Sequence, residues 1–198
     1  MNSDLEGKVV LVTGGAGGIG SVISKSFAEQ GAKVIVHYND SKENAEKISK
    51  EINGFAIKAD LTDSEQTKEL FNSIIQKEGK IDICIANAGK YPKDYAPLWE
   101  IESDRWNNTV STNLSLTYNT SRYFLKHAAE TKKGSLVLIG STAGLYGEAG
   151  HADYAAAKGA ITSGLLRTMK NDAALIGNGV RVNAIAPGWT VSQKKIDE

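Results

Sequence analysis

A glycine-rich turn at residues 13–20, Thr-Gly-Gly-Ala-Gly-Gly-Ile-Gly, constrains the fold of this chain more than any other feature. Residues 8–12 before it are β-branched and apolar, which is typical of a fully buried parallel strand. Apolar residues then recur at helical spacing from Ile19 to Phe27, and Gly31 is a typical helix stop. A strand, a glycine turn and a helix in this order predict a dinucleotide site, because glycines let the backbone approach the pyrophosphate and the helix amino terminus supplies N–H donors.

Strand-like runs and helical patterns alternate along the whole chain. The six runs lie at about residues 8–12, 33–38, 55–59, 81–86, 135–140 and 180–186. The helix that ends near Gly79 carries a capping-box signal, Thr62-x-x-Glu65. Such alternation implies a parallel sheet with right-handed crossovers. We therefore predict an α/β fold, a doubly wound Rossmann-type parallel sheet in three α/β/α layers, as a single domain over residues 1–198.

Tyr154 and Lys158 form the most informative pair for chemistry. They are four residues apart in a helical pattern, so both side chains lie on one face. A free tyrosine has a pKa near ~10, and a nearby ammonium group lowers it by favouring the phenolate. Proton transfer works best when the pKa of the group approaches the working pH. The pair alone is common on exposed helices, but Ser141 directly follows a buried strand and so lies at the edge where open α/β sheets bind ligands.

The composition of the 198 residues is that of one ordinary globular domain. Lys plus Arg equal Asp plus Glu at 23 each, so no basic field favours nucleic acid or membrane as a partner. No apolar run approaches the roughly 20 residues of a membrane span, and the start lacks a secretory pattern. The single cysteine, Cys84, excludes an intrachain disulfide and fits a reducing compartment. We expect a cytoplasmic protein with a small-molecule substrate.

Several separated motifs together resemble the short-chain dehydrogenase/reductase family, in its standard rather than its extended branch. Besides the glycine turn, the motifs are Ala59-Asp60-Leu61-Thr62, Asn87-Ala88-Gly89, Ser111-Thr112-Asn113-Leu114, the set Ser141, Tyr154 and Lys158, and Pro187-Gly188. They run across the chain in the family's order. Ala86 departs from the pattern, which usually has a further Asn there. The resemblance implies an NAD(P)-dependent oxidoreductase that interconverts a carbonyl and a secondary alcohol.

The resemblance assigns a role to each of four catalytic residues. Tyr154 is the general acid in reduction and the general base in oxidation. Ser141 hydrogen-bonds the substrate oxygen, and Lys158 binds the nicotinamide ribose and lowers the pKa of Tyr154. Asn113 holds a water that links Lys158 to solvent.

The resemblance also implies a cofactor site. Its residues are Thr13, Gly14, Gly18, Ile19, Gly20, Tyr38, Ser41, Asp60, Leu61, Asn87, Ala88, Gly89, Tyr154, Lys158, Pro187, Gly188 and Thr190. NADP(H) is favoured over NAD(H), because Tyr38 stands where NAD-specific members carry an acid, and Ser41 and Lys42 are placed to meet a 2′-phosphate. Gly17 and Asp40 argue in the opposite direction.

Two further residues are candidates for the substrate pocket. Tyr146 and His151 lie on the connection between Ser141 and Tyr154. Aromatic residues of the segment 90–104, namely Tyr91, Tyr95 and Trp99, either line the pocket or cover the core. His37 and His127 lack the spacing of a metal site, so no metal is predicted and a structural role is expected for both.

Members of the family usually continue beyond the Pro187-Gly188 turn through a substrate-covering loop and helix to a seventh strand. This chain ends at Glu198, so we expect that segment to be absent and one sheet edge to be less covered. The resemblance further implies a homo-oligomer, a dimer or a tetramer.

The sequence leaves several functions open. A reductase resembling the 3-oxoacyl-[acyl-carrier-protein] reductases is favoured, and a sugar or polyol dehydrogenase of the same family is the first alternative. A non-catalytic dinucleotide-binding scaffold is the second, motivated by the short carboxyl-terminal part. An extended-family epimerase or dehydratase ranks last, because its glycine spacing normally differs and its chain is longer.

Overall fold

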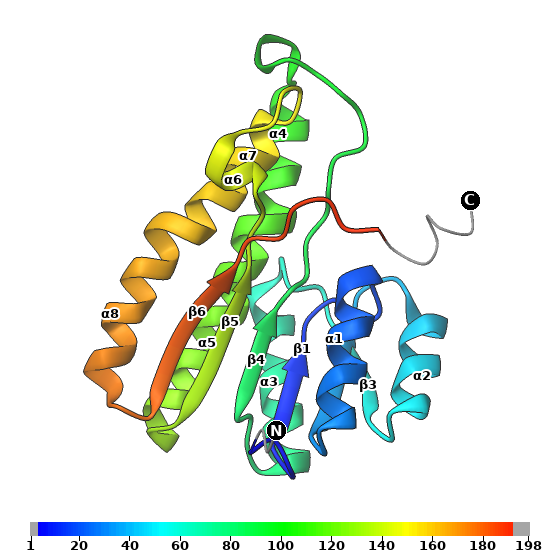
Figure 1. The fold of residues 1–198 in the computed structure, drawn as a ribbon, viewed down its shortest axis with the longest axis vertical. Helices are drawn as coiled ribbons and strands as arrows, with labels where there is room; N and C mark the ends of the chain where they lie inside the picture. The colour runs from blue at the N-terminus through cyan, green and yellow to red at the C-terminus, as the bar shows by residue number, and fades with distance from the viewer. Residues whose placement is uncertain (1–3, 192–198) are drawn as a thin grey trace.

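A six-stranded parallel sheet in the order β3-β2-β1-β4-β5-β6 forms the centre of the computed structural model, which describes residues 4–191 (Figure 1). The strands are β1 (Val9–Val12), β2 (Lys33–Tyr38), β3 (Phe55–Lys58), β4 (Ile83–Ala86), β5 (Gly134–Ile139) and β6 (Val180–Ile185). Each begins and ends within two residues of its predicted bounds. The structure confirms the doubly wound Rossmann-type fold, because the strand order reverses beside β1.

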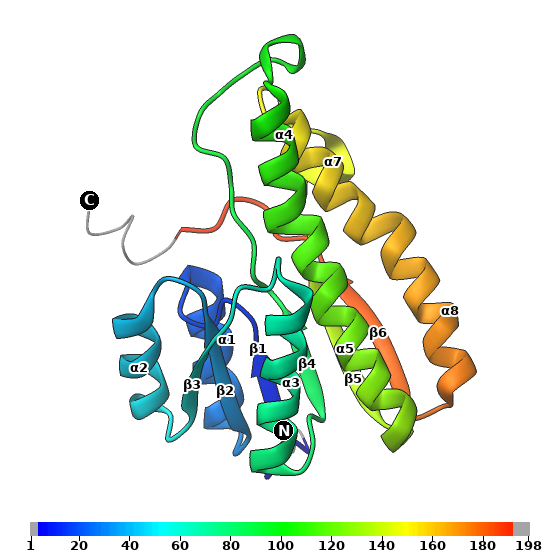
Figure 2. The ribbon, with the colours of Figure 1, turned by 180° about the vertical axis from the view of Figure 1, so that it is seen from behind.

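Two layers of helices enclose the sheet (Figures 1 and 2). The larger core cluster joins one face of the sheet to α3 (Ser64–Glu78), α5 (Leu116–Thr131) and α8 (Leu166–Ile176). The smaller cluster joins the opposite face to α1 (Gly18–Glu29) and α2 (Lys42–Glu51). Burial on both faces explains why β1 reads as an unbroken apolar run.

Three helices lie beyond the carboxyl ends of the strands rather than on the faces of the sheet (Figure 1). They are α4 (Ser103–Val110), the short α6 (Ala143–Tyr146) and α7 (Ala152–Ala160). α6 and α7 pack against each other, and α4 packs against α7. These helices place side chains above the sheet edge at which ligands are expected.

β6 differs from the central strands because it lies at the edge of the sheet. Val180 and Val182 are buried, whereas Arg181, Asn183 and Ile185 are exposed. This alternation shows that only one face of β6 is covered in the part of the chain that the structure describes.

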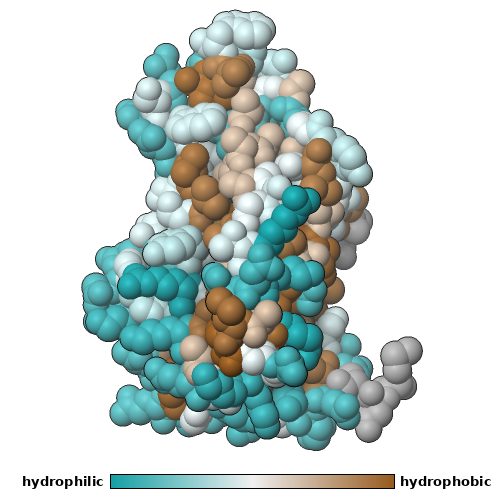
Figure 3. Space-filling model, turned by 90° about the vertical axis from the view of Figure 1, so that its left-hand side faces the viewer, coloured by the Kyte–Doolittle hydropathy of each residue, from teal (hydrophilic) through white to brown (hydrophobic). Residues whose placement is uncertain are grey.

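Seen from the side on which α8 lies, hydrophobic side chains gather in groups separated by hydrophilic ones (Figure 3). Within residues 4–191, no helix is both long and apolar enough to cross a membrane.

The amino-terminal cap of α3 is Asp63, which corrects the predicted capping box at Thr62. The Asp63 carboxylate accepts hydrogen bonds from the backbone N–H groups of Glu65 and Gln66, at 2.8 and 3.1 Å. Thr62 is otherwise engaged, because its N–H and its hydroxyl both donate to the Asp60 carboxylate. A carboxylate at this position compensates the first N–H groups of the helix.

Two long helical runs each contain a π-helical turn that the sequence analysis did not foresee. Ser111–Ser115 joins α4 to α5, and Ile161–Leu165 joins α7 to α8. Asn113 lies inside the first turn, and Lys158 lies three residues before the second. Such turns occur frequently at functional sites.

Glycine is required where α6 meets α7. A Cβ atom on Gly144 would lie 2.5 Å from the Gly159 nitrogen and 2.5 Å from the Lys158 carbonyl carbon. Since these are backbone atoms of the helix that carries Tyr154, a side chain at this point would push the helix away.

We predict that Gly144→Ala lowers the free energy of unfolding by about 1–3 kcal/mol, the usual cost of overpacking. Gly164→Ala is the matched control, because nothing lies within 4 Å of its added Cβ. Urea denaturation followed by circular dichroism measures both variants. Equal stability of the two would contradict the close contact between α6 and α7.

Candidate active site

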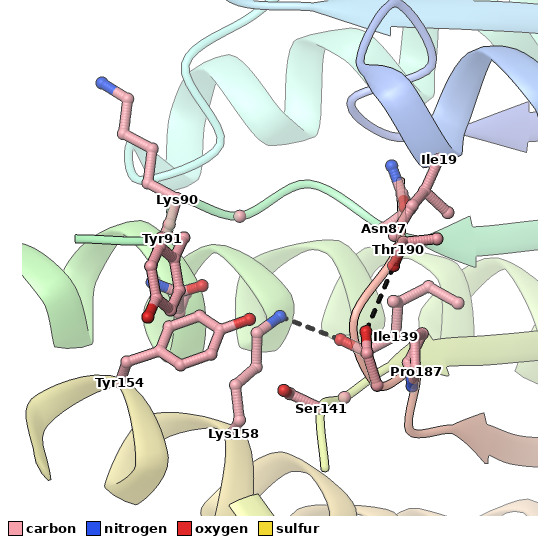
Figure 4. Close-up of a pocket in the computed structure, with 14 residues that line it drawn as sticks. Ile19, Asn87, Lys90, Tyr91, Ile139, Ser141, Tyr154, Lys158, Pro187 and Thr190 are labelled. Carbon is pink, nitrogen blue, oxygen red and sulfur yellow. Dashed lines mark hydrogen bonds between the residues drawn. The ribbon is translucent and has the colours of Figure 1, made fainter. Parts of the chain in front are cut away.

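Two adjoining hollows follow the carboxyl ends of the strands. The larger is a groove of about 1290 Å³ that runs from the glycine turn past the ends of β2 and β3. The smaller is a cavity of about 190 Å³ (Figure 4). The groove leads into the cavity, because the two hollows share five lining residues, Ile19, Asn87, Gly89, Lys90 and Thr190.

Thr13 ties together the two loops that bound the groove. Its hydroxyl oxygen accepts hydrogen bonds from the N–H groups of Asn87 and Ala88, at 2.9 and 3.0 Å. The same hydroxyl donates to the Ile85 carbonyl at 3.2 Å. Thr13 is fully buried and lines neither hollow, so it supports the site from below.

The glycine turn is packed tightly against itself. A Cβ atom on Gly20 would lie 2.2 Å from the Gly14 carbonyl oxygen, and Gly14 has a positive φ of 60°. The N–H of Gly14 donates to Nδ1 of His37 at 3.0 Å, and His37 Nε2 lies 3.0 Å from the Ala59 carbonyl oxygen. Burial lowers the pKa of His37 to about 4, which keeps the ring neutral and able to accept from Gly14. His37 thus has a structural role beneath the turn.

The amino terminus of α1 is open to an anion. Its N-cap, Gly17, offers no side chain, and its first turn contains no acidic residue. The N–H groups and the positive end of the helix dipole therefore face the groove without a competing side-chain acceptor. This is the feature that a pyrophosphate requires.

The structure places nearly all the predicted cofactor residues in the two hollows. Those along the groove are Gly14, Gly18, Ile19, Gly20, Tyr38, Ser41, Asp60, Leu61, Asn87, Ala88, Gly89 and Thr190. Those along the cavity include Tyr154, Lys158, Pro187 and Gly188. Lys42 does not line the groove, and its ammonium lies 3.7 Å from the Glu46 carboxylate. Between residues 4 and 191, no group of three or more His, Cys, Asp and Glu is placed to hold a metal ion.

The four predicted catalytic side chains meet around the cavity. Asn113 comes from the first π-helical turn, Ser141 follows β5, and Tyr154 and Lys158 come from α7. Figure 4 shows the Tyr154 hydroxyl pointing toward the side of the cavity that holds Lys158 and Ser141.

Lys158 is almost completely buried. Its ammonium donates to the Ile139 carbonyl at 2.9 Å, which fixes the side chain against the end of β5. Burial lowers the pKa of Lys158 to about 8, because a charged amine loses hydration in the protein. The residue still carries its proton at neutral pH.

The pKa of Tyr154 is raised above its ordinary value. Burial raises the pKa of Tyr154, the neighbouring Ser141 hydroxyl lowers it, and the charge of Glu148 raises it. The Lys158 nitrogen is bound to the Ile139 carbonyl and lies 5.7 Å from the centre of the Tyr154 ring. Tyr154 is therefore a protonated phenol at neutral pH.

The side-chain amide of Asn113 uses its N–H donors in hydrogen bonds, whereas its oxygen has no partner. Its Nδ2 donates to the carbonyls of Lys90 and Thr109, at 2.8 and 3.0 Å. Its buried Oδ1 has no hydrogen-bond partner. A Cβ atom on Gly89 would lie 2.8 Å from that oxygen and 3.3 Å from the Lys158 nitrogen, so glycine leaves space between the two polar atoms.

Neither of the two predicted substrate residues lines the cavity. Tyr146 is 85% exposed and does not line the cavity. His151 is buried behind the cavity, where it stacks on Tyr91 with ring centres 4.7 Å apart. Tyr91 does line the cavity, and its ring meets that of Tyr154 edge-on at 5.1 Å.

Arg105 and Asp153 are functional candidates that the sequence analysis missed. The Asp153 carboxylate is fully buried and accepts from the Arg105 guanidinium at 3.0 and 3.3 Å and from the Thr109 hydroxyl at 2.8 Å. Asp153 immediately precedes Tyr154, so the pair fixes the start of α7. The partners are 48 residues apart, and no local pattern marks them.

Comparison with known proteins gives a consistent family assignment. Residues 8–197 match the family model described as short chain dehydrogenase. A 3-oxoacyl-[acyl-carrier-protein] reductase FabG of Thermotoga maritima is 37% identical over 190 residues, covering 93% of this chain and 75% of that protein. The protein of the same name from Vibrio harveyi is 36% identical over 188 residues, covering 94% and 75%. A third, from Staphylococcus epidermidis, is 33% identical and covers 93% and 76%.

We predict that Glu148→Gln lowers the pKa of Tyr154, because the substitution removes a negative charge that raises it. The amide oxygen can still accept the hydrogen bond from Tyr91. In a pH–rate profile for reduction, activity is lost as pH rises through the pKa of Tyr154, so this limb should move to lower pH.

Glu29→Gln is the control, since Glu29 ends α1 at the opposite end from the glycine turn. An unmoved limb in Glu148→Gln would rule out an effect of the Glu148 charge on Tyr154.

Proposed function

This chain belongs to the short-chain dehydrogenase family and is an NAD(P)-dependent oxidoreductase of carbonyl and CH–OH groups, and from this premise we propose that Tyr154, Ser141, Lys158 and Asn113 are its catalytic set. The proposed reaction interconverts a carbonyl and a secondary alcohol, with 3-oxoacyl thioesters as the favoured substrates. The convergence of four side chains from three separate segments on one cavity carries this proposal.

Tyr154 supplies the proton in the proposed reduction. Its raised pKa keeps the phenol protonated, so it can donate to the carbonyl oxygen as negative charge develops there. Ser141 hydrogen-bonds the same oxygen and holds the carbonyl within reach of Tyr154. Bound nicotinamide provides the hydride in reduction and accepts it in oxidation.

Lys158 and Asn113 return the proton. One of the three N–H donors of Lys158 is used on Ile139, which leaves two for the ribose of the cofactor and a water. The orphaned Oδ1 of Asn113 faces the space beside Gly89, where a water would satisfy it. Such a water would connect Lys158 with solvent, and Lys158 would then be the source from which Tyr154 regains its proton.

The residues present fit a nicotinamide dinucleotide. The uncapped start of α1 suits the pyrophosphate, and the groove ends at the cavity that holds Tyr154. We propose NADP(H) as the preferred form. Ser41 supports it, because it lies in the groove at the start of α2 and its hydroxyl makes no capping hydrogen bond. Asp40, also in the groove, opposes a 2′-phosphate.

We propose that the protein forms a dimer or a tetramer. Support comes from the family to which the chain belongs. Light scattering coupled to size-exclusion chromatography measures the mass directly, and a mass near 21.2 kDa would reject the proposal.

Fluorescence titration with NADPH and NADH, followed by turnover on ketones, oxoacyl thioesters and aldoses, tests the function. We expect tighter binding of NADPH and reduction of an oxoacyl thioester. Oxidation of sugar alcohols alone would favour a polyol dehydrogenase. Cofactor binding without turnover of any compound would favour a non-catalytic scaffold.

We predict that Tyr154→Phe lowers kcat/KM by about 10²–10⁴-fold, the usual contribution of a general acid. The dissociation constant of the cofactor should change little, because the ring remains. Tyr118→Phe is the control, since Tyr118 is half exposed on α5. Full turnover by Tyr154→Phe would contradict the proposed mechanism.

A further inference from the structure

Tyr91 stands at the outer side of the catalytic cavity. It follows β4 by five residues in the chain, and its ring lies beside that of Tyr154 with its hydroxyl pointing away from Lys158 (Figure 4). The edge of one ring faces the other, with centres 5.1 Å apart. A substrate whose carbonyl reaches Tyr154 therefore has the Tyr91 ring as its immediate neighbour.

Three side chains of one short segment hold this ring. The Tyr91 hydroxyl donates to the Glu148 carboxylate at 2.6 Å, a short bond to a charged acceptor. The Tyr91 ring itself makes two further contacts. It stacks on the His151 ring and meets the Tyr154 ring edge-on. Glu148, His151 and Tyr154 all belong to the connection between α6 and α7 and to the start of α7. The ring is thus fixed in place although it is partly exposed.

The backbone around Tyr91 is fixed as well. Ala96 donates its N–H to the Gly150 carbonyl at 3.1 Å. Arg105 donates to the carbonyls of Asp94 and Gly150 at 2.7 and 3.1 Å and also binds Asp153. A Cβ atom on Gly150 would lie 2.2 Å from the Tyr95 ring. The two loops that carry Tyr91 and Glu148 are therefore joined at several points.

The Tyr91 ring and the side chains that hold it form one wall of the cavity. The space inside this wall is small. The cavity measures about 190 Å³, whereas pockets for drug-sized ligands measure about 300–1,000 Å³. The nicotinamide would occupy the part beside Ile19, Pro187 and Thr190. A long substituent that leaves the cavity on this side passes the Tyr91 ring.

We propose that Tyr91, held by Glu148 and His151, determines specificity by limiting the size of the larger substituent on the carbonyl substrate. This inference rests on the proposed function, because it needs a carbonyl bound at Tyr154. Glu148 is a positioning residue in this proposal, since it acts on the substrate through Tyr91.

Two β-keto esters test the wall, ethyl acetoacetate and hexyl acetoacetate, which share the reacting ketone and differ in one substituent. We expect Tyr91→Ala to raise the ratio of kcat/KM for hexyl over ethyl ester at least tenfold. Tyr91→Phe keeps the ring but loses its hydrogen bond to Glu148, so it should raise the ratio by a smaller factor than Tyr91→Ala. Glu148→Ala should raise it by a smaller factor than Tyr91→Ala, whereas Glu148→Gln should not, because its amide still accepts from Tyr91.

An unchanged ratio in Tyr91→Ala overturns the proposal. Circular dichroism and the dissociation constant of NADPH show whether each variant is folded. If the natural protein reduces neither ester, the proposed function has failed for this class, and the wall is tested by binding of each ester to the NADPH complex. In that measurement Tyr91→Ala should raise the relative affinity for the hexyl ester, and equal relative affinities, or no binding of either ester, overturn the proposal.

Discussion

The hydroxyl of Thr13 is the contact on which the rest of the site depends. It binds the N–H groups of Asn87 and Ala88 and the Ile85 carbonyl, and so locks the end of β1 to the end of β4 inside the protein. Through this contact the glycine turn and the loop leading to Lys90 keep one fixed separation. Because the Lys90 carbonyl of that loop also accepts a hydrogen bond from the Asn113 amide, the groove and the cavity are parts of one connected edge.

Burial sets the charges at the centre of this edge. It lowers the pKa of Lys158 and raises that of Tyr154, so at neutral pH an ammonium group and an uncharged phenol lie close together. A phenol that starts protonated suits the reduction of a carbonyl, whereas oxidation must first remove this proton. The charge of Glu148 adds to this bias.

Much of this architecture was predictable from the sequence, because local patterns determine it. Buried parallel strands such as β1 appear as apolar runs, and glycine spacing marks the turn after it. The order of the motifs predicted that Ser141, Tyr154 and Lys158 belong to one site. Arg105 with Asp153, and Tyr91 with Glu148, were not predictable, since each pair joins segments about fifty residues apart through side-chain contacts that leave no periodic trace. The cap at Asp63 was missed because Thr62 satisfies Asp60 instead of the helix.

The two π-helical turns change the direction of the side chains that follow them. Successive residues of an α-helix are rotated by about 100°, so one extra residue in a turn rotates every later side chain by that angle. In the run from α7 to α8, the stripe that presents Tyr154 and Lys158 is consequently out of phase with the stripe that packs on β6. The turn Ser111–Ser115 has the same effect on Asn113 and the face of α5. The polar side chains that line the cavity and the apolar side chains that pack on the sheet therefore point in directions that one uninterrupted α-helix would not give them.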